Sequence, residues 1–188
     1  PTETPTEKPT EKPTEKPTEK PINPIELGVT SVVLSIKKVT LGVGESFQIK
    51  ASVIPENALS KSLTYNASNN KVSVSASGKV KAKKTGTCQV TVQAANGKKA
   101  VITVVVKKAP KKITIKVKNK KLKVGKKVQI KIKLPKNTAS NKITYSSSKK
   151  SVASVSASGK ITAKKRGKTT ITAKTFNGKK AKIKITVK

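Results

Sequence analysis

Histidine, aspartate, methionine and tryptophan are all absent from this 188-residue chain, and each of its 8 acidic residues is a glutamate. General acid–base catalysis usually recruits His, Asp or Glu. Beyond residue 27 only Glu45 and Glu56 remain, both in turn-like positions. A nucleophile also needs an activating base and an orienting group, which two isolated glutamates do not supply. We therefore expect no enzyme activity and no catalytic or cofactor-binding site.

Cysteine occurs once, at Cys88, so the chain has no internal disulfide. Soft-metal sites need several Cys or His ligands, and we therefore expect no metal site. Alternation with Val90 and Val92 points Cys88 toward a core, which favours an inert buried thiol over a reactive one.

Long hydrophobic runs are also missing, since none approaches the ~20 residues that span a bilayer, and we expect no membrane insertion. The chain begins at Pro1 without a signal peptide. We interpret it as a piece of a longer secreted bacterial protein whose targeting signal lies upstream.

Residues 1–27 are dominated by a four-residue period, Pro-Thr-Glu-Lys, which recurs from Pro5 to Lys20. The repeat has no apolar residue to bury and is expected to be a disordered or polyproline-II-like linker. At ~3.1 Å per residue, residues 1–21 would reach roughly 65 Å at most. Its role is either a spacer at a cell wall or an ordinary interdomain linker.

An internal repeat follows, with a unit of about 80 residues. It predicts two domains, 28–108 and 109–188. The matching segments are Val43-Gly44 with Val124-Gly125, Leu63-Thr64-Tyr65 with Ile143-Thr144-Tyr145, Val74–Val80 with Val155–Ile161, and Asn96–Ala100 with Asn177–Ala181.

Apolar residues alternate with polar ones within each unit, which is typical of half-buried antiparallel strands. The predicted inward sets of the second unit are Val128, Ile130, Ile132 and Leu134; Thr169, Ile171, Ala173 and Thr175; and Ala181, Ile183, Ile185 and Val187. Asn96-Gly97 and Asn177-Gly178 predict type I′ hairpins. About seven short strands per unit predict an all-β fold of two tandem immunoglobulin-like β-sandwiches.

These segments resemble group 2 of the bacterial immunoglobulin-like domains, found in intimin- and invasin-type adhesins and in secreted bacterial enzymes. The resemblance covers nearly all of residues 29–188 and rests on Val43-Gly44-Glu45, Pro55–Ala58, Thr64-Tyr65 and Gly86–Thr91, with Val124-Gly125-Lys126, Pro135–Asn137, Thr144-Tyr145 and Gly167–Thr172 in the second copy. It implies an extracellular stalk or binding role. Tyrosine stands where Trp is common. The second copy has Lys at acidic turn positions, so calcium binding of some relatives is not expected there.

The two copies differ in net charge. The chain carries 43 Lys+Arg, and its net charge is +35. Residues 28–108 hold 13 Lys and two Glu, whereas residues 109–188 hold 26 Lys+Arg and no acid. Such a field costs stability through self-repulsion and attracts polyanions. A solvated, lysine-rich surface that keeps strand edges unpaired is the alternative.

The expected polyanion-binding residues are basic side chains of the second copy: Lys116, Lys118, Lys131, Lys133, Lys160, Lys164, Lys165, Arg166, Lys182 and Lys184. With one arginine among them, binding should be diffuse and salt-sensitive. We expect no specific nucleic-acid binding, because stacking aromatics are few and no recognition helix is predicted.

Three functions remain open, all for a monomer at the bacterial cell surface. The first is attachment to an anionic cell-wall polymer such as teichoic acid through the second domain. The second is an accessory module of a polysaccharide-degrading enzyme that binds an acidic polysaccharide. The third is a structural stalk with no ligand.

Overall fold

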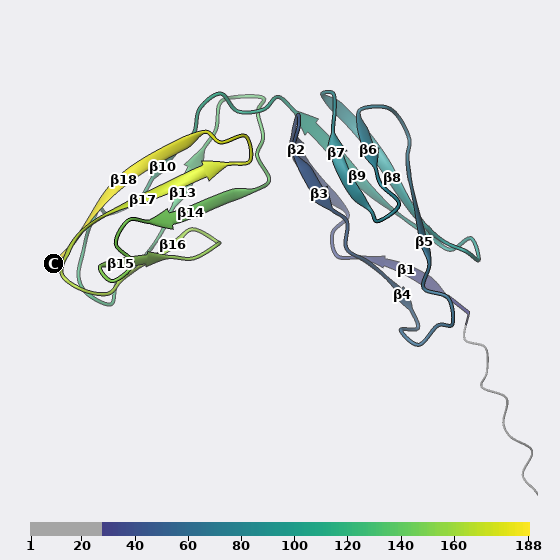
Figure 1. Cartoon of the computed structure of the whole chain (residues 1–188), viewed down its shortest axis with the longest axis horizontal. Helices are drawn as coiled ribbons and strands as arrows, with labels where there is room; N and C mark the ends of the chain where they lie inside the picture. The colour runs from purple at the N-terminus through teal and green to yellow at the C-terminus, as the bar shows by residue number, and fades with distance from the viewer. Residues whose placement is uncertain (1–27) are drawn as a thin grey trace, which may run out of the picture.

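A computed structural model describes residues 28–188, which fold as strands and turns with no helix among them. The strands form two β-sandwiches, here called domain 1 (28–108) and domain 2 (109–188). Figure 1 shows domain 1 in purple to teal and domain 2 in green to yellow. The all-β prediction is therefore confirmed for the described residues. The predicted linker, 1–27, lies outside them.

Domain 1 consists of nine strands: β1 (Ser31–Leu34), β2 (Lys38–Gly42), β3 (Ser46–Gln48), β4 (Ala51–Ile54), β5 (Leu63–Ala67), β6 (Val72–Val74), β7 (Lys79–Ala82), β8 (Gly86–Ala94) and β9 (Lys99–Lys107). One face is the four-stranded sheet β2-β9-β8-β5, in which β2 runs parallel to β9. The other face comprises β3-β7-β6 and the pair β1-β4.

Domain 2 repeats this plan with β10 (Thr114–Lys116), β11 (Lys121–Leu122), β12 (Lys127–Gln129), β13 (Lys131–Lys133), β14 (Ile143–Ser147), β15 (Ala153–Val155), β16 (Lys160–Ala163), β17 (Gly167–Thr175) and β18 (Lys180–Val187). Its sheets are β11-β18-β17-β14, β12-β16-β15 and β10-β13. Each strand therefore has its counterpart in domain 1, as expected for an internal repeat.

The alternating segment 128–134 forms two strands rather than one. Strand β12 pairs with β16, whereas β13 pairs with β10 in a separate sheet. The chain changes sheet at Ile130, which is buried and donates its N–H to the carbonyl of Gly159. The side-chain alternation continues through this change, because β12 and β13 lie on the same face of the sandwich and Val128, Ile130 and Ile132 all pack against one core.

Each domain has its own hydrophobic core, formed by residues of both its faces. Ile171 and Ile185 of domain 2 are fully buried, as the alternation predicts. Cys88 of domain 1 is 1% exposed, and its counterpart Thr169 is 4% exposed. The Thr169 hydroxyl accepts a 3.0 Å hydrogen bond from the N–H of Lys149. Because the cores are separate, each domain buries its own apolar side chains.

The type I′ prediction for the Asn-Gly hairpins is wrong. A type I′ turn needs positive φ at both central residues, but among the described residues outside glycine only Asn137 has a positive φ. Instead the N–H of Gly97 bonds to the carbonyl of Ala94 at 2.9 Å, and Gly97 itself has φ 86°. The loop is thus one residue longer, a turn with negative φ followed by a glycine bulge. The hairpin at Gly178 (φ 83°) repeats it.

The tyrosine of each copy packs on a turn glycine. A Cβ atom at Gly159 would lie 2.9 Å from Cζ of Tyr145, and one at Gly78 would lie 2.7 Å from the Tyr65 ring. Both tyrosines contact the cores. Desolvation by burial raises the pKa of the Tyr145 phenol.

Candidate functional site

The lysines expected to bind polyanions do not form one cluster. Lys116 lies directly opposite Lys131 across β10 and β13, with Lys133 on the same pair of strands. The others are distributed over separate elements: Lys118 follows β10, Lys160 begins β16, Lys164, Lys165 and Arg166 connect β16 to β17, and Lys182 and Lys184 lie on β18. The lysines of β10 and β13 and those of β18 therefore belong to different sheets.

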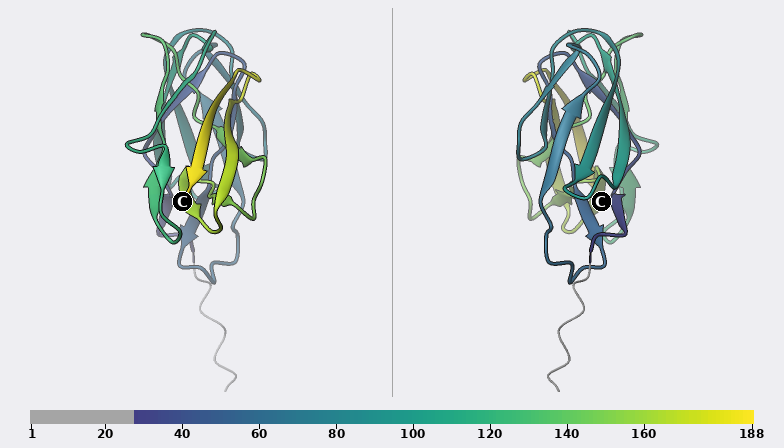
Figure 2. Two further views of the ribbon diagram at one scale, coloured as in Figure 1. Left: turned by 90° about the vertical axis from the view of Figure 1, so that its left-hand side faces the viewer. Right: turned by 90° about the vertical axis from the view of Figure 1, so that its right-hand side faces the viewer.

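A broader array covers the outer side of the four-stranded sheet of domain 2. The strand register places Lys168 opposite Thr186, Thr170 opposite Lys184, Thr172 opposite Lys182 and Lys174 opposite Lys180. All five lysines are exposed, and the threonines between them are half-buried. We call this surface the lysine–threonine face. In the left view of Figure 2, β17 and β18 lie in front, so domain 1 does not cover them.

The same positions in domain 1 are largely neutral. Along β8 and β9 the register pairs Thr87 with Val105, Gln89 with Thr103, Thr91 with Val101 and Gln93 with Lys99. These positions thus hold five lysines in domain 2 but only one, Lys99, in domain 1. The two sheets share their pairing, so this difference is not a requirement of the fold.

Like charges on this face are close enough to repel each other. Lys174 and Lys180 lie directly opposite each other in the register, an arrangement that destabilises a sheet. Domain 2 contains no acidic residue that could neutralise them. The positive field of the face therefore stays uncompensated within the domain.

A hollow of about 500 Å³ opens at one end of this face. Lys149, Lys168 and Lys184 surround it together with four hydroxyl-bearing residues, Ser148, Thr169, Thr170 and Thr186. Lys149 and Lys168 are not among the polyanion-binding residues expected from the sequence. Their counterparts in the first copy are the neutral Asn69 and Thr87, and this difference between the copies is the sequence signal that points to them.

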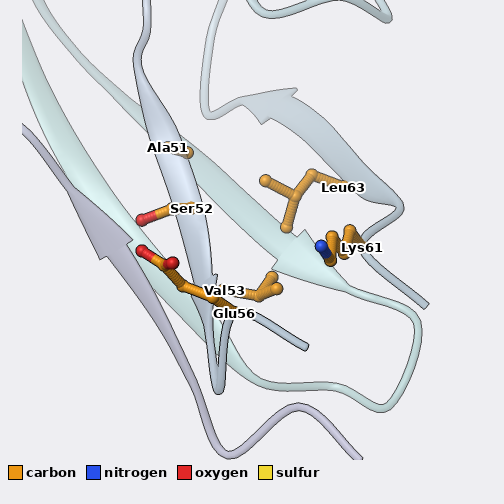
Figure 3. A pocket seen from close by; sticks show the side chains of 6 residues that line it. All are labelled: Ala51, Ser52, Val53, Glu56, Lys61 and Leu63. Atoms are coloured by element: carbon orange, nitrogen blue, oxygen red, sulfur yellow. The ribbon is translucent and has the colours of Figure 1, made fainter. Parts of the chain in front are cut away.

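Domain 1 has a smaller hollow, of about 320 Å³, beside β4 and β5. Its charged side chains are Glu56 and Lys61, which lie on opposite sides of Val53 in Figure 3. One exposed carboxylate with no second acid or imidazole beside it offers no acid–base pair. We assign this hollow no chemistry.

The second unusual feature is the junction between the domains. Glu45 is 2% exposed, although it is charged. Its Oε2 accepts hydrogen bonds of 2.9 Å from the N–H groups of Gly42 and Asn141, and its Oε1 accepts one of 2.7 Å from the N–H of Lys142. A domain 1 carboxylate is thus bound by the backbone of domain 2. The counterpart of Glu45 in domain 2 is the exposed Lys126.

The two domains also pack closely at Gly42, whose N–H bonds to this carboxylate. A Cβ atom at Gly42 would collide with the carbonyl oxygen of Ala139 and lie 2.6 Å from Cε1 of Phe176. Phe176 replaces Ala95 of the first copy. Pro110 is fully buried, and its carbonyl accepts a 2.9 Å hydrogen bond from Nδ2 of Asn177. Gly42, Glu45 and Phe176 differ from their counterparts Lys123, Lys126 and Ala95. The Asn177 bond, in contrast, is repeated in domain 1, where Nδ2 of Asn96 donates to the carbonyl of Val29 at 2.6 Å.

Residues 28–188 include no group of three or more Cys, Asp or Glu side chains that could hold a metal ion. The same residues contain no helix that is long and apolar enough to cross a membrane.

Two consecutive sandwiches with the same strand order define a tandem immunoglobulin-like module. Residues 28–105 and 109–186 each match the family model of the bacterial Ig-like domain (group 2). The chain belongs to this family, with two tandem copies, as the sequence resemblance indicates.

Segments of two curated proteins are similar to this chain. An Ig-like virion protein of Serratia phage KSP90 is 37% identical over 75 residues, which are 39% of this chain and 29% of that protein. A kappa-carrageenase of Pseudoalteromonas carrageenovora is 40% identical over 82 residues, which are 43% of this chain and 21% of the enzyme. The chain thus spans less than a third of either relative.

Three solved structures are similar to this chain at low sequence identity and with low TM-scores. Domains 4 and 5 of the S-layer protein SbsC are 22% identical, with a TM-score of 0.37 and coverage of 86% of this chain and 99% of that one. A C-terminal fragment of intimin, solved with the intimin-binding domain of its receptor, is 18% identical, with a TM-score of 0.35 and coverage of 85% and 64%. The Yersinia pseudotuberculosis adhesin InvE is 16% identical, with a TM-score of 0.38 and coverage of 83% and 58%.

Proposed function

We propose that this chain is a non-catalytic, extracellular module of a larger bacterial protein and that domain 2 attaches it to the cell surface by binding an anionic cell-wall polymer. The observation that carries the proposal is the lysine–threonine face, where five lysines occupy positions that hold one lysine in domain 1. The fold does not need these charges, and their mutual repulsion costs stability. A polyanion laid on the face would turn that repulsion into attraction.

The relatives support an extracellular location. The fold is shared with an S-layer protein and with the adhesins intimin and InvE. Domain 1 then acts mainly as a spacer, since its equivalent sheet is nearly neutral.

The test is sedimentation of the full 188-residue chain with purified bacterial cell walls across a salt series. We expect binding that weakens steeply as salt rises, because exposed charges are screened within ~3 Å at 1 M salt. Walls from which the anionic polymers have been extracted should bind far less. Equal binding to extracted and intact walls, or binding that salt leaves unchanged, would contradict the proposal.

A second candidate is an accessory module of a polysaccharide-degrading enzyme, favoured by the 40% identical segment within a kappa-carrageenase. This function predicts a preference for one acidic polysaccharide over others of equal charge density. Binding to walls and to a panel of acidic glycans distinguishes the two functions. A chain that binds neither at physiological salt would be a structural spacer.

A further inference from the structure

We propose that the hollow at the end of the lysine–threonine face is a subsite for one compact oxyanion group, a phosphate or sulfate, carried by the bound polymer. This inference rests on the proposed function and makes it more specific. Attachment would then depend on a defined anchor point as well as on diffuse charge.

The strands place the basic side chains of the hollow around one point. Lys184 lies on β18 opposite Thr170 of β17, and Lys168 lies two residues before Thr170 on the same face. Neighbouring strands are ~4.8 Å apart and same-face residues along a strand are ~6.8 Å apart. The long flexible stems of lysine can therefore bring these ammonium groups to one anion.

The third lysine enters from the loop after β14, and its backbone is fixed. The N–H of Lys149 donates a 3.0 Å hydrogen bond to the buried hydroxyl of Thr169. The neighbouring Ser148 hydroxyl accepts a 2.9 Å hydrogen bond from the N–H of Thr170. The wall of the hollow is thus held by hydrogen bonds between the loop after β14 and strand β17, and only the lysine side chains remain to be ordered when an anion binds.

Hydroxyls complete the set of donors. Thr170 and Thr186 line the hollow beside the three lysines, and hydroxyl donors with ammonium groups suit an oxyanion with several acceptor oxygens. No carboxylate competes for the lysines, because residues 109–188 contain no acid. The site is therefore selective for an anionic group.

Domain 1 shows what the same position looks like without this chemistry. The three lysines Lys149, Lys168 and Lys184 are replaced there by Asn69, Thr87 and Thr103. The side-chain amide of Asn69 forms hydrogen bonds within domain 1: its Nδ2 donates to the carbonyl of Thr87 at 3.1 Å, and its Oδ1 accepts from the N–H of Lys71 at 3.1 Å. Domain 2 thus has three cations where domain 1 has neutral side chains.

A second basic hollow, of about 280 Å³, provides the matched control. It lies beside β10 and β13 and also contains three lysines, Lys112, Lys116 and Lys133. Its remaining lining is Thr114, Leu134 and Pro135, so it has one hydroxyl instead of four. Equal charge can therefore be removed from either hollow, with different consequences for a site that needs hydroxyls as well as lysines.

The experiment compares two triple variants of the full chain, K149Q/K168Q/K184Q and K112Q/K116Q/K133Q. Binding to purified, phosphate-bearing wall polymer is measured beside NMR titrations with inorganic phosphate and with sulfate. We expect the first variant to lose at least ~10-fold more affinity for the polymer than the control. We also expect the phosphate or sulfate shifts of the parent chain to concentrate on the amides of 148–149, 168–170 and 184–186. Equal shifts with phosphate and sulfate would show that the subsite recognises the oxyanion charge alone. Different shifts would show which of the two groups on the polymer it prefers.

Two further results separate the outcomes. A Thr170→Val variant keeps every charge, and a several-fold loss in this variant supports a defined subsite. Equal losses in the two triple variants, with anion shifts spread over all lysine surfaces, would overturn the subsite while leaving electrostatic attachment intact. A parent chain that does not bind the polymer at all would instead overturn the proposed function.

Discussion

The backbone N–H of Lys142 donates a 2.7 Å hydrogen bond to Oε1 of Glu45, although the two residues belong to different domains. Asn141 donates a second bond of 2.9 Å to the other oxygen. Bonds to a charged acceptor are stronger than neutral ones, and leaving a buried group without its partner is costly. The carboxylate of Glu45 therefore fixes the loop before β14 against domain 1.

Replacing Glu45 with Ala should loosen this junction without unfolding either sandwich. The variant removes the acceptor of three backbone N–H groups, at a cost of about 1–3 kcal/mol for each group left unsatisfied. Water will restore part of this once the junction opens. We expect a broader range of interdomain orientations, measured by small-angle scattering or residual dipolar couplings.

The control is Glu56→Ala, which removes the same charge from an exposed position of domain 1. It should leave the interdomain orientation unchanged. An equal effect of the two variants would mean that net charge, and not the hydrogen bonds of Glu45, orients the domains.

Gly42→Ala tests the close approach at the junction. Its Cβ would meet the carbonyl oxygen of Ala139 and the Phe176 ring, so the two domains must move apart. Because a main-chain oxygen yields less easily than a flexible side chain, we expect a loss of interdomain order similar to that of Glu45→Ala. The control is Gly28→Ala, where a Cβ meets nothing within 4 Å. Unchanged dipolar couplings in Gly42→Ala would contradict the packing described above.

Cys88 should react with thiol reagents only when domain 1 unfolds. The side chain is 1% exposed, and a buried structural thiol is usually inert. The rate of labelling under native conditions should therefore follow the opening of domain 1 and rise sharply with denaturant. Fast labelling of the native chain would show an accessible thiol instead. Cys88→Ala, which cannot be labelled, provides the blank.

Salt should stabilise domain 2 more than domain 1. Residues 109–188 hold 26 basic residues and no acid, and screening reduces the repulsion among them. The midpoint of denaturant unfolding, followed by NMR signals from each domain, should rise with NaCl mainly for domain 2. Equal shifts in the two domains would indicate a general solvent effect rather than relief of repulsion.

Local sequence patterns predicted the strands well and the hairpins poorly. The inward positions of β17 and β18 follow directly from alternation, because the side-chain period of a strand is two residues. The Asn-Gly pair at Asn96 predicts a two-residue turn, but of these two residues only Gly97 has a positive φ. The pair is compatible with both loop lengths, and the pairing of β8 with β9 selects the longer one.

The lysine surface illustrates a similar limit. Lys182 and Lys184 were expected from composition and alternation, while Lys149 and Lys168 were not. Their proximity to Lys184 depends on how β14 and β17 are aligned with β18. The pairing of strands distant in sequence sets that alignment, and no local pattern specifies it.

By itself, the sequence determined the all-β class, the two-copy organisation, the family and the concentration of charge in domain 2, because each follows from periodicity, repetition or composition. The tertiary structure decided which charges act together and how the copies meet. Glu45 resembles any exposed turn glutamate until domain 2 supplies its two N–H donors. The lysines of β17 and β18 form one face only through strand pairing. Both properties arise from contacts between residues far apart in the chain, so the folded structure was needed to reveal them.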